Sequence, residues 1–183
     1  MKRCLWVEGA KPDYLEYHDK EWGEPVYDDK VFFEFLVLES AQAGLSWYTI
    51  LKRRQGYRNA FAEFDPIKVS QFDESKVEEL MQDVGIICNR AKIIAAINNA
   101  QRFLEIQKEF DSFNNYVWEF VGGKPLINTY TEGEMPPATT KESDALAKDL
   151  KKRGFKFLGT TTIYAFMQAC GLVNDHSEDC FKR

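Results

Sequence analysis

Two cysteines and two histidines near the ends of the chain have the chemistry of a metal site. The sequence of 183 residues contains only two histidines: Cys4 lies 14 residues before His18, and Cys180 lies four residues after His176. Two thiolates and two imidazoles are a common donor set for tetrahedral structural zinc. The interval from Cys4 to His18 is not a standard zinc-finger spacing, so the alternative is two surface histidines with incidental cysteines. A zinc ion here would tie the first residues to the last and would leave no histidine free as a general base.

A second chemical feature is Glu39, an acidic residue in an apolar helical segment. Asp28 or Asp29 is expected to cap this helix, which is apolar almost all round and should be buried. No lysine or arginine lies three or four residues from Glu39 in either direction. Because an unpaired buried carboxylate is costly, we expect Glu39 to have a partner. A ligand is one candidate, and a neighbouring helix N-terminus or a distant arginine is the other.

Aromatic residues that could enclose a ligand accompany Glu39 along the chain. The N-terminal segment contributes Trp6, Tyr14, Tyr17 and Trp22. After Glu39, Gly44 is expected to end the helix and Ser46 to cap the next one. Trp47 would then stand at a helix start, beside the end of the helix that carries Glu39.

The segment Phe155-Lys156-Phe157-Leu158-Gly159 is expected to form a tight hairpin between two helices, over about residues 143–171. Gly154 should stop the first helix, and Thr160 or Thr161 should cap the second. The second helix has apolar residues at helical spacing and should end at Gly171; they are Ile163, Phe166, Met167 and Cys170.

Backbone N–H groups at the start of that second helix would form an anion site. The hairpin region is also basic, with one aspartate, Asp149, among the residues Lys148, Lys151, Lys152, Arg153 and Lys156. A phosphate-binding helix–hairpin–helix is therefore one interpretation. An ordinary helical hairpin with a solvated basic face is the other.

The composition is typical of a globular protein with a sizeable core. Hydrophobic residues make up 44% of the chain, and its length suits one domain or two small lobes that share a core. No apolar run approaches the ~20 residues of a membrane span, and the N-terminus lacks a signal-peptide core, so we expect a cytoplasmic protein without a membrane partner. The net charge of −5 argues against a uniformly basic surface, although a local patch could still bind nucleic acid.

Long motifs make the chain resemble the 3-methyladenine DNA glycosylase I family along nearly its whole length. The segments are Arg3-Cys4-x-Trp6, Tyr17-His18-Asp19-x-Glu21-Trp22-Gly23, Glu39-x-x-Gln42-Ala43-Gly44-Leu45-Ser46-Trp47, Lys151-Lys152-Arg153-Gly154-Phe155-Lys156-Phe157-x-Gly159 and Met167-Gln168-Ala169-Cys170-Gly171-Leu172-Val173-Asn174-Asp175-His176. The resemblance implies an all-α helix–hairpin–helix DNA glycosylase fold, in one domain over residues 1–183. It also implies one structural zinc ion per chain, at Cys4, His18, His176 and Cys180.

The resemblance further implies a monofunctional DNA repair enzyme. Such an enzyme flips 3-methyladenine out of alkylated double-stranded DNA, hydrolyses its N-glycosidic bond and leaves an abasic site. Its partners would be that DNA and the free base, and we expect a monomer. Asp175 should be held beside the zinc site and should not act as a base.

The same resemblance assigns roles to individual residues. Glu39 and Tyr17 would hydrogen-bond the flipped base, with Glu39 as the catalytic residue, and Trp47 would stack on the base. The rest of the pocket would be formed by Trp6, Tyr14, Trp22 and Gln42. DNA would contact Gly154, Lys156, Gly159 and Thr160 in the hairpin, and Gly44-Leu45 would lie near the gap left in the duplex.

A 3-methylated adenine in DNA is cationic, so its glycosidic bond is already weak and it leaves as a neutral base. An aromatic cage and a Glu39 carboxylate would both favour the cation over neutral adenine, and water would be the nucleophile. Two other functions fit the same residues. One is a glycosylase with another lesion preference, such as 7-methylguanine or a mismatch, and the other is a zinc-stabilised module that binds DNA or a protein without chemistry.

Overall fold

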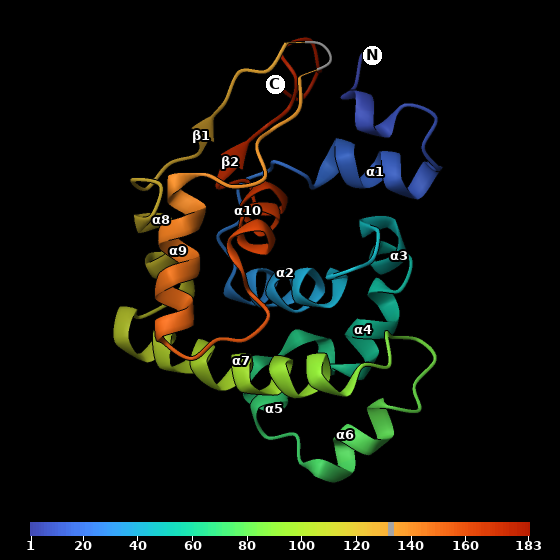
Figure 1. The fold of residues 1–183 in the computed structure, drawn as a ribbon, viewed down its shortest axis with the longest axis vertical. Helices are drawn as coiled ribbons and strands as arrows, with labels where there is room; N and C mark the ends of the chain where they lie inside the picture. Colours follow the sequence, from blue (N-terminus) through green and yellow to red (C-terminus); the bar gives the residue numbers. More distant parts are fainter. Residues whose placement is uncertain (132–133) are drawn as a thin grey trace.

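Helices make up almost all of the regular secondary structure in the described residues. The computed structural model describes residues 1–131 and 134–183, and its elements are η1 (Leu5–Val7), α1 (Pro12–Lys20), α2 (Asp29–Gln42), α3 (Trp47–Leu51), α4 (Arg54–Ala60), η2 (Ala62–Phe64), α5 (Pro66–Ser70), α6 (Glu74–Leu80), α7 (Arg90–Phe110), α8 (Phe113–Glu119), β1 (Leu126–Ile127), α9 (Lys141–Lys152), α10 (Thr160–Ala169) and β2 (Val173–Asn174) (Figure 1). The expected helical class is confirmed, apart from one pair of two-residue strands.

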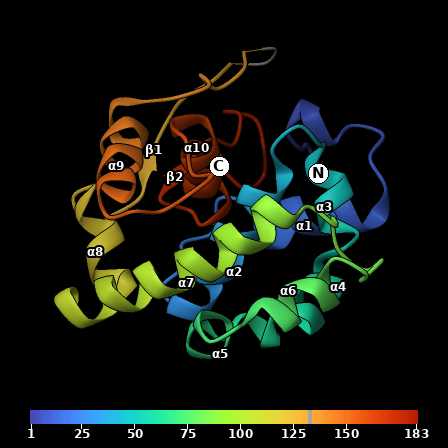
Figure 2. The same cartoon turned by 60° about the horizontal axis from the view of Figure 1, so that its bottom comes forward.

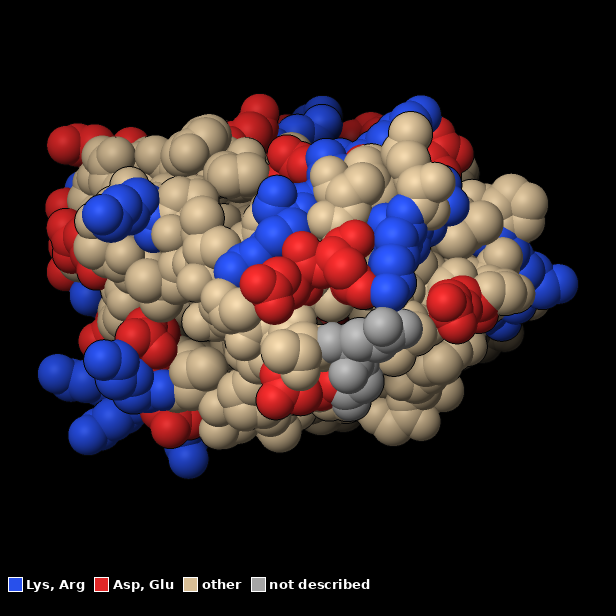
Figure 3. All heavy atoms as spheres, turned by 90° about the horizontal axis from the view of Figure 1, so that it is seen from above, with Lys and Arg blue, Asp and Glu red and all other residues tan. Residues whose placement is uncertain are grey.

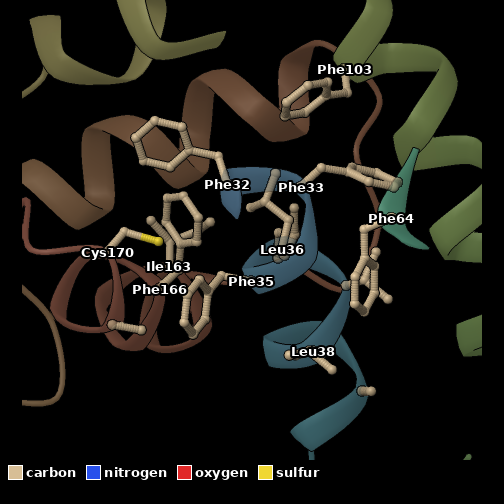
Figure 4. Close-up of a cluster of buried hydrophobic side chains, with 14 of the residues drawn as sticks. Phe32, Phe33, Phe35, Leu36, Leu38, Phe64, Phe103, Ile163, Phe166 and Cys170 are labelled. Atoms are coloured by element: carbon tan, nitrogen blue, oxygen red, sulfur yellow. The ribbon is translucent and has the colours of Figure 1, made fainter. Parts of the chain in front are cut away.

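Helix α2 lies at the centre and is buried along most of its length. Asp28 is its N-cap, as predicted, and its side chain accepts hydrogen bonds from the backbone N–H groups of Lys30 and Val31. Side chains of α2 meet those of α7 and α10 in the core, and Figure 4 shows Phe33 of α2 near Phe103 and Phe32 near Phe166. Since α2 is held from several sides, it provides a rigid base for Glu39, close to its C-terminal end.

The turn after α2 follows the sequence prediction. The helix ends at Gln42, and Gly44 has a left-handed backbone with φ of +82°. Ser46 caps α3 by accepting a hydrogen bond from the N–H group of Thr49. Trp47 therefore stands at the first position of α3, beside the end of α2.

Helix α7 is the longest element and extends across the molecule (Figure 2). It packs against α5, α6 and α8 as well as α2. The side chain of Lys92, in its first turn, donates to the carbonyl oxygens of Ala41 and Ala43, each at 2.8 Å. The C-terminal end of α2 is thereby fixed to α7.

The two ends of the chain meet on one side of the molecule (Figure 1). Strand β1 pairs with β2 in parallel, with Leu126 opposite Val173. The backbone N–H group of Phe181 donates to the carbonyl oxygen of Lys2 at 3.0 Å. Figure 3 shows the molecule from above, with acidic and basic side chains interspersed on this face. This face is therefore not uniformly basic, as the net charge predicts. Within the described residues, no helix has both the length and the apolar character that a membrane span requires.

Candidate functional site: an aromatic cavity beside a cysteine–histidine cluster

A cavity of about 390 Å³ lies between the N-terminal segment and helices α2, α3 and α10. Its size is within the range of small-molecule sites, roughly 300–1,000 Å³. The structure brings all seven predicted pocket residues to its wall, namely Trp6, Tyr14, Tyr17, Trp22, Glu39, Gln42 and Trp47. Residues that are far apart along the chain therefore converge on one space.

The aromatic residues of the cavity support one another through ring contacts. The centroid of the Trp6 ring lies 5.0 Å from that of Trp22 and 5.2 Å from that of Tyr14. The centroid of the Tyr17 ring lies 5.5 Å from that of Trp47. Tyr14 and Tyr17 are three residues apart on α1 and so share one face of that helix. These contacts fix the rings in place before a ligand enters.

Glu39 is buried in this wall with no ionic partner. Only 4% of the residue is exposed, and its Oε2 atom has no hydrogen-bond partner among the described residues. Burial raises the pKa of Glu39 to about 8. Burial therefore favours the protonated form of Glu39 in the free protein, and a Glu39 carboxylate facing a cationic base stays a prediction. The other predicted partners of Glu39 were a distant arginine and the N-terminus of a neighbouring helix. Neither is bonded to Glu39 among the described residues, so that alternative is wrong there.

A second glutamate on α2 shows what a paired carboxylate looks like in this protein. Glu34 is also buried, and its Oε1 atom accepts from Nε of Arg54 at 2.6 Å and pairs with Arg58 at 2.9 Å. Both arginines belong to α4. Glu34 is paired within the protein, whereas Oε2 of Glu39 has no partner among the described residues. A buried polar atom of this kind is expected to have a partner from outside the described part of the protein.

Two indole groups in the same wall are also unpaired. The Nε1 atoms of Trp6 and Trp47 are buried without an acceptor among the described residues. The cavity thus offers two N–H donors and one carboxyl oxygen to whatever fills it. A few convergent polar groups in an aromatic wall are typical of a site that orients a planar heterocycle.

The cysteine–histidine cluster adjoins this cavity. The ligand atoms of Cys4, His18, His176 and Cys180 all lie within 4.8 Å of one another, and all four residues are buried. Sγ of Cys180 lies 3.6 Å from Nε2 of His18 and 3.5 Å from Nδ1 of His176. Metal–sulfur and metal–nitrogen bonds of about 2.3 and 2.0 Å at a tetrahedral angle place such atoms roughly 3.5 Å apart. The four side chains therefore fit a tetrahedral metal ion.

Hydrogen bonds outside the cluster turn both imidazoles toward its centre. Nδ1 of His18 lies 2.8 Å from a carboxylate oxygen of Asp19, which is itself paired with Arg3 at 2.7 Å. Nε2 of His176 lies 2.9 Å from the carbonyl oxygen of Trp22. These acceptors place a proton on the outward nitrogen and leave the inward nitrogen free to bind a metal. The predicted ligand set is confirmed as a cluster that could hold an ion.

The cluster and the cavity share residues and neighbours. Trp22 lines the cavity, and its ring centroid lies 4.7 Å from that of His176. Tyr17 directly precedes His18, and Trp6 follows Cys4 by two residues. The segments that carry the cluster therefore also carry much of the aromatic wall.

The predicted hairpin lies between α9 and α10, and most of its expected features are present. Gly154 follows the end of α9 with φ of +90°, and Gly171 follows α10 with φ of +64°. The predicted cap was wrong, because Gly159 is the N-cap of α10 and no side chain caps that helix. Thr160 instead donates its hydroxyl to a carboxylate oxygen of Asp144 on α9.

One basic residue of the hairpin region is not free to bind phosphate. Arg153 pairs with Glu109 and Asp149, each at 2.6 Å, so its charge is already neutralised. Lys156 and Gly159 are exposed on the hairpin, as a phosphate contact requires. A Cβ built at Gly159 would meet no atom within 4 Å, so the packing of the protein does not itself demand glycine there.

Asp175 is held by three donors, as predicted. Its carboxylate accepts from the Tyr164 hydroxyl at 2.6 Å, from the Gln168 amide at 2.8 Å and from the Asn128 amide at 2.7 Å. A carboxylate with both oxygens bonded to side chains is poorly placed to activate water.

Several residues of the cavity wall were not predicted from the sequence, including Tyr130, Thr131, Glu134, Met135, Tyr164 and Gln168. Of these, only the spacing of Tyr164 and Gln168 on one helix face offered a signal.

Comparisons with known proteins agree with this geometry. The family model described as "Methyladenine glycosylase" matches residues 6–183. The chain is 52% identical over 180 residues to DNA-3-methyladenine glycosylase 1 of Escherichia coli (strain K12), covering 98% of this chain and 96% of that protein.

Two solved structures have closely similar folds. A crystal structure of 3-methyladenine DNA glycosylase I has a TM-score of 0.94 at 52% identity, covering 98% of both chains. A tyrosine-to-phenylalanine variant of 3-methyladenine DNA glycosylase I in complex with 3-methyladenine also has a TM-score of 0.94, at 41% identity, covering 98% of this chain and 96% of that one. The chain therefore belongs to the methyladenine glycosylase family.

Proposed function

We propose that this protein is a monofunctional DNA-3-methyladenine glycosylase, which hydrolyses the N-glycosidic bond of 3-methyladenine in alkylated DNA and leaves an abasic site. The observation that carries the proposal is the aromatic cavity with its unpaired Glu39 oxygen and two unpaired indole N–H groups. Relatives that share about half of its residues are named for this activity. One solved relative binds 3-methyladenine itself.

The cavity suits a flipped purine. A base inside a duplex cannot reach a buried carboxyl group, so it must leave the stack and enter the pocket. Trp47 would stack on the base, and Trp6, Tyr14 and Trp22 would enclose it. Tyr17, Gln42 and Glu39 would contact its polar edge. Ring faces attract a cationic methylated base more strongly than neutral adenine.

The protonation state of Glu39 adds a way to read the base. A protonated carboxyl group carries one donor and one acceptor. The outer edge of an adenine offers an N6 amino donor beside the N7 acceptor, so one carboxyl group can bind both. If the entering base is a cation, it favours the ionised form of Glu39 and lowers its pKa, and a proton is released. In both cases the base supplies the partner that Glu39 lacks in the described structure.

Hydrolysis of the N-glycosidic bond needs only modest catalysis from the protein. A cationic base leaves as a neutral molecule, so no general acid is required, and water attacks the sugar carbon. Asp175 is saturated by its three donors, and both histidines belong to the cysteine–histidine cluster. Binding, orientation and the exclusion of water from a buried pocket are therefore the expected sources of catalysis.

The remaining parts would support this site. Zinc is the ion that best suits the donor set of the cluster, and when bound it would stabilise the joined chain ends without taking part in the reaction. Gly154, Lys156 and Gly159, with the backbone N–H group of Thr160, would bind a DNA phosphate at the start of α10. Gly44 and Leu45 would lie near the gap in the duplex. The chain would act as a single domain over residues 1–183, as a monomer in the cytoplasm.

A base-release assay on methylated duplex DNA tests the proposal. We expect 3-methyladenine as the main released base when products are separated by chromatography, with strand breaks only after alkali treatment. Release of 7-methylguanine alone would replace the proposal with another lesion preference.

A binding experiment tests the non-enzymatic alternative. We expect free 3-methyladenine to quench the tryptophan fluorescence, with adenine as the control. Equal quenching by both bases, or none, together with no base release would favour a DNA- or protein-binding module.

A further inference from the structure

Two neighbouring asparagines on α7 hold the hairpin between α9 and α10. The side-chain Oδ1 of Asn99 accepts from the backbone N–H group of Lys156 at 2.8 Å, and its Nδ2 donates to the carbonyl oxygen of Lys156 at 2.9 Å. Asn98 donates to the carbonyl oxygen of Gly154 at 2.9 Å and to Oδ1 of Asn99 at 3.2 Å. One amide side chain thus pairs with both polar groups of a hairpin residue, as a neighbouring β-strand would.

Asn99 is built into the core and does not face solvent. Only 2% of the residue is exposed, and both polar atoms of its amide are bonded to Lys156. Asn99 is distant in sequence from Lys156, by 57 residues, so the bonds form only when α7 and the hairpin are docked together. A buried amide with this arrangement is costly to lose, because two hairpin backbone groups would be left without a partner.

The hairpin residue that follows Lys156 needs such restraint. Phe157 has φ of +56°, in the left-handed region that a bulky side chain rarely adopts, and 46% of the residue is exposed. Strain of this kind persists only when neighbouring contacts fix the backbone. The exposed Phe157 ring cannot provide all of that restraint. The two bonds to Lys156, immediately before it, restrain the backbone directly.

The same restraint determines where the start of α10 points. Two residues after Phe157, Gly159 is the exposed N-cap of α10, and no side chain caps that helix. Rotation at Phe157 would turn Leu158 and Gly159 away from their present positions, and with them the first turn of α10.

We propose that Asn99, assisted by Asn98, is a positioning residue, which holds the hairpin in the conformation that presents the first amides of α10 to a DNA phosphate. The inference rests on the proposed function, because it requires a DNA substrate. It assigns to α7 a part in DNA binding through residues that need not touch DNA.

The test compares two ligands of the same variant. For Asn99→Ala we expect the affinity for a duplex with a tetrahydrofuran abasic-site analogue to fall about tenfold, with free 3-methyladenine bound within roughly twofold of wild type. If a phosphate contact is lost, the slope of log affinity against log salt should also decrease by about one. Asn98→Ala removes fewer bonds and should cause a smaller loss, of about threefold, so it serves if Asn99→Ala does not fold.

A double-mutant cycle separates positioning from simple destabilisation. Glycine adopts a left-handed backbone without strain, so Phe157→Gly should make the hairpin less dependent on Asn99. We expect the loss of DNA affinity caused by Asn99→Ala to be clearly smaller in the Phe157→Gly background than in wild type. Equal losses in both backgrounds, or unchanged affinity and salt slope in Asn99→Ala and Asn98→Ala, would overturn the inference. If wild-type protein neither bound the abasic duplex nor released 3-methyladenine, the proposed function itself would fail.

Discussion

Nδ1 of His176 lies 3.4 Å from Sγ of Cys4, although 172 residues separate them in the chain. This contact closes the polypeptide into a loop through its two ends. It also places Trp22 and Tyr17 on segments that the cluster holds, so the same contact organises the aromatic cavity.

Loss of the proposed zinc ion should weaken both the fold and the pocket. For Cys180→Ser we expect loss of bound zinc by elemental analysis. An ion present at a thousandfold its Kd stabilises the folded protein by about 4 kcal/mol. Its loss should therefore lower the melting temperature by roughly 8–16 °C. Quenching of the tryptophan fluorescence by 3-methyladenine should need more base, because the wall is less ordered. Cys88→Ser, at an exposed cysteine outside the cluster, is the control. A full complement of zinc in Cys180→Ser would contradict the prediction.

Replacement of Glu39 by glutamine should stabilise the protein. The folded protein keeps the Glu39 proton up to about pH 8, whereas the unfolded chain loses it near pH 4.5. The free energy of unfolding of wild type should therefore fall as pH rises through this window, and Glu39→Gln should lack that decrease. The difference should be roughly 3 kcal/mol at pH 7 and close to zero at pH 4. Urea denaturation at both pH values measures it, with Glu119→Gln on the surface as the control.

The same substitution should weaken binding of the base. A glutamine amide keeps a donor and an acceptor for the base edge but cannot ionise, so it loses the attraction between a carboxylate and a positively charged base. For Glu39→Gln we expect a loss of affinity for free 3-methyladenine of about tenfold by calorimetry, and for Glu39→Ala a larger loss. If the affinity stayed at the wild-type value in both variants, Glu39 would have no part in recognition. Greater stability with weaker binding would identify a residue kept for function.

A negative charge at the hairpin should oppose phosphate binding while helping the helix. For Gly159→Asp we expect about tenfold weaker binding to abasic duplex DNA, because the carboxylate occupies the N-terminal end of α10. The thermal stability should be unchanged or slightly higher, since aspartate is a good N-cap and a Cβ has open space there. Gly159→Ser adds a neutral cap and should retain most of the affinity. Equal affinities for Gly159→Asp and Gly159→Ser would separate the hairpin from phosphate binding.

Lys92 should matter for stability despite its place at the edge of the core. Its ammonium group donates to two carbonyl oxygens at the end of α2, and burial lowers its pKa. Lys92→Met would leave both carbonyls without this partner and should lower the free energy of unfolding by about 1–3 kcal/mol. Lys30→Met, at an exposed position near the other end of α2, should have little effect. A difference of less than about 0.5 kcal/mol between the two variants would count against the role of Lys92.

Local signals in the sequence were sufficient for much of the fold. The caps Asp28 and Ser46 and the stop at Gly154 depend on interactions within a few residues, so they can be predicted from spacing. The cysteine–histidine cluster could be predicted for a different reason. With only two histidines and four cysteines in the chain, few combinations of ligands exist.

Features that depend on contacts between distant segments could not be predicted. Arg153 looked like part of a free basic face, and only the position of Glu109 on α7 shows that its charge is paired. The strands β1 and β2 are two residues each and carry no period-two pattern that could be recognised. The protonation of Glu39 depends on burial that many side chains produce together. Asn99 has no local signal at all, because its role lies in a hairpin far along the chain.

Lys92 and Asn99 lie seven residues apart on α7, and one holds the end of α2 while the other holds the hairpin. Seven residues are almost two full turns, a rise of about 10.5 Å on a single side of the helix. A single helix, α7, therefore connects the proposed phosphate-binding hairpin to the end of α2 that lies beside the base pocket. A residue inserted between these two positions would turn Asn99 by about 100° and lengthen the helix by about 1.5 Å. Such an insertion would therefore break either the contact of α7 with the end of α2 or its contact with the hairpin.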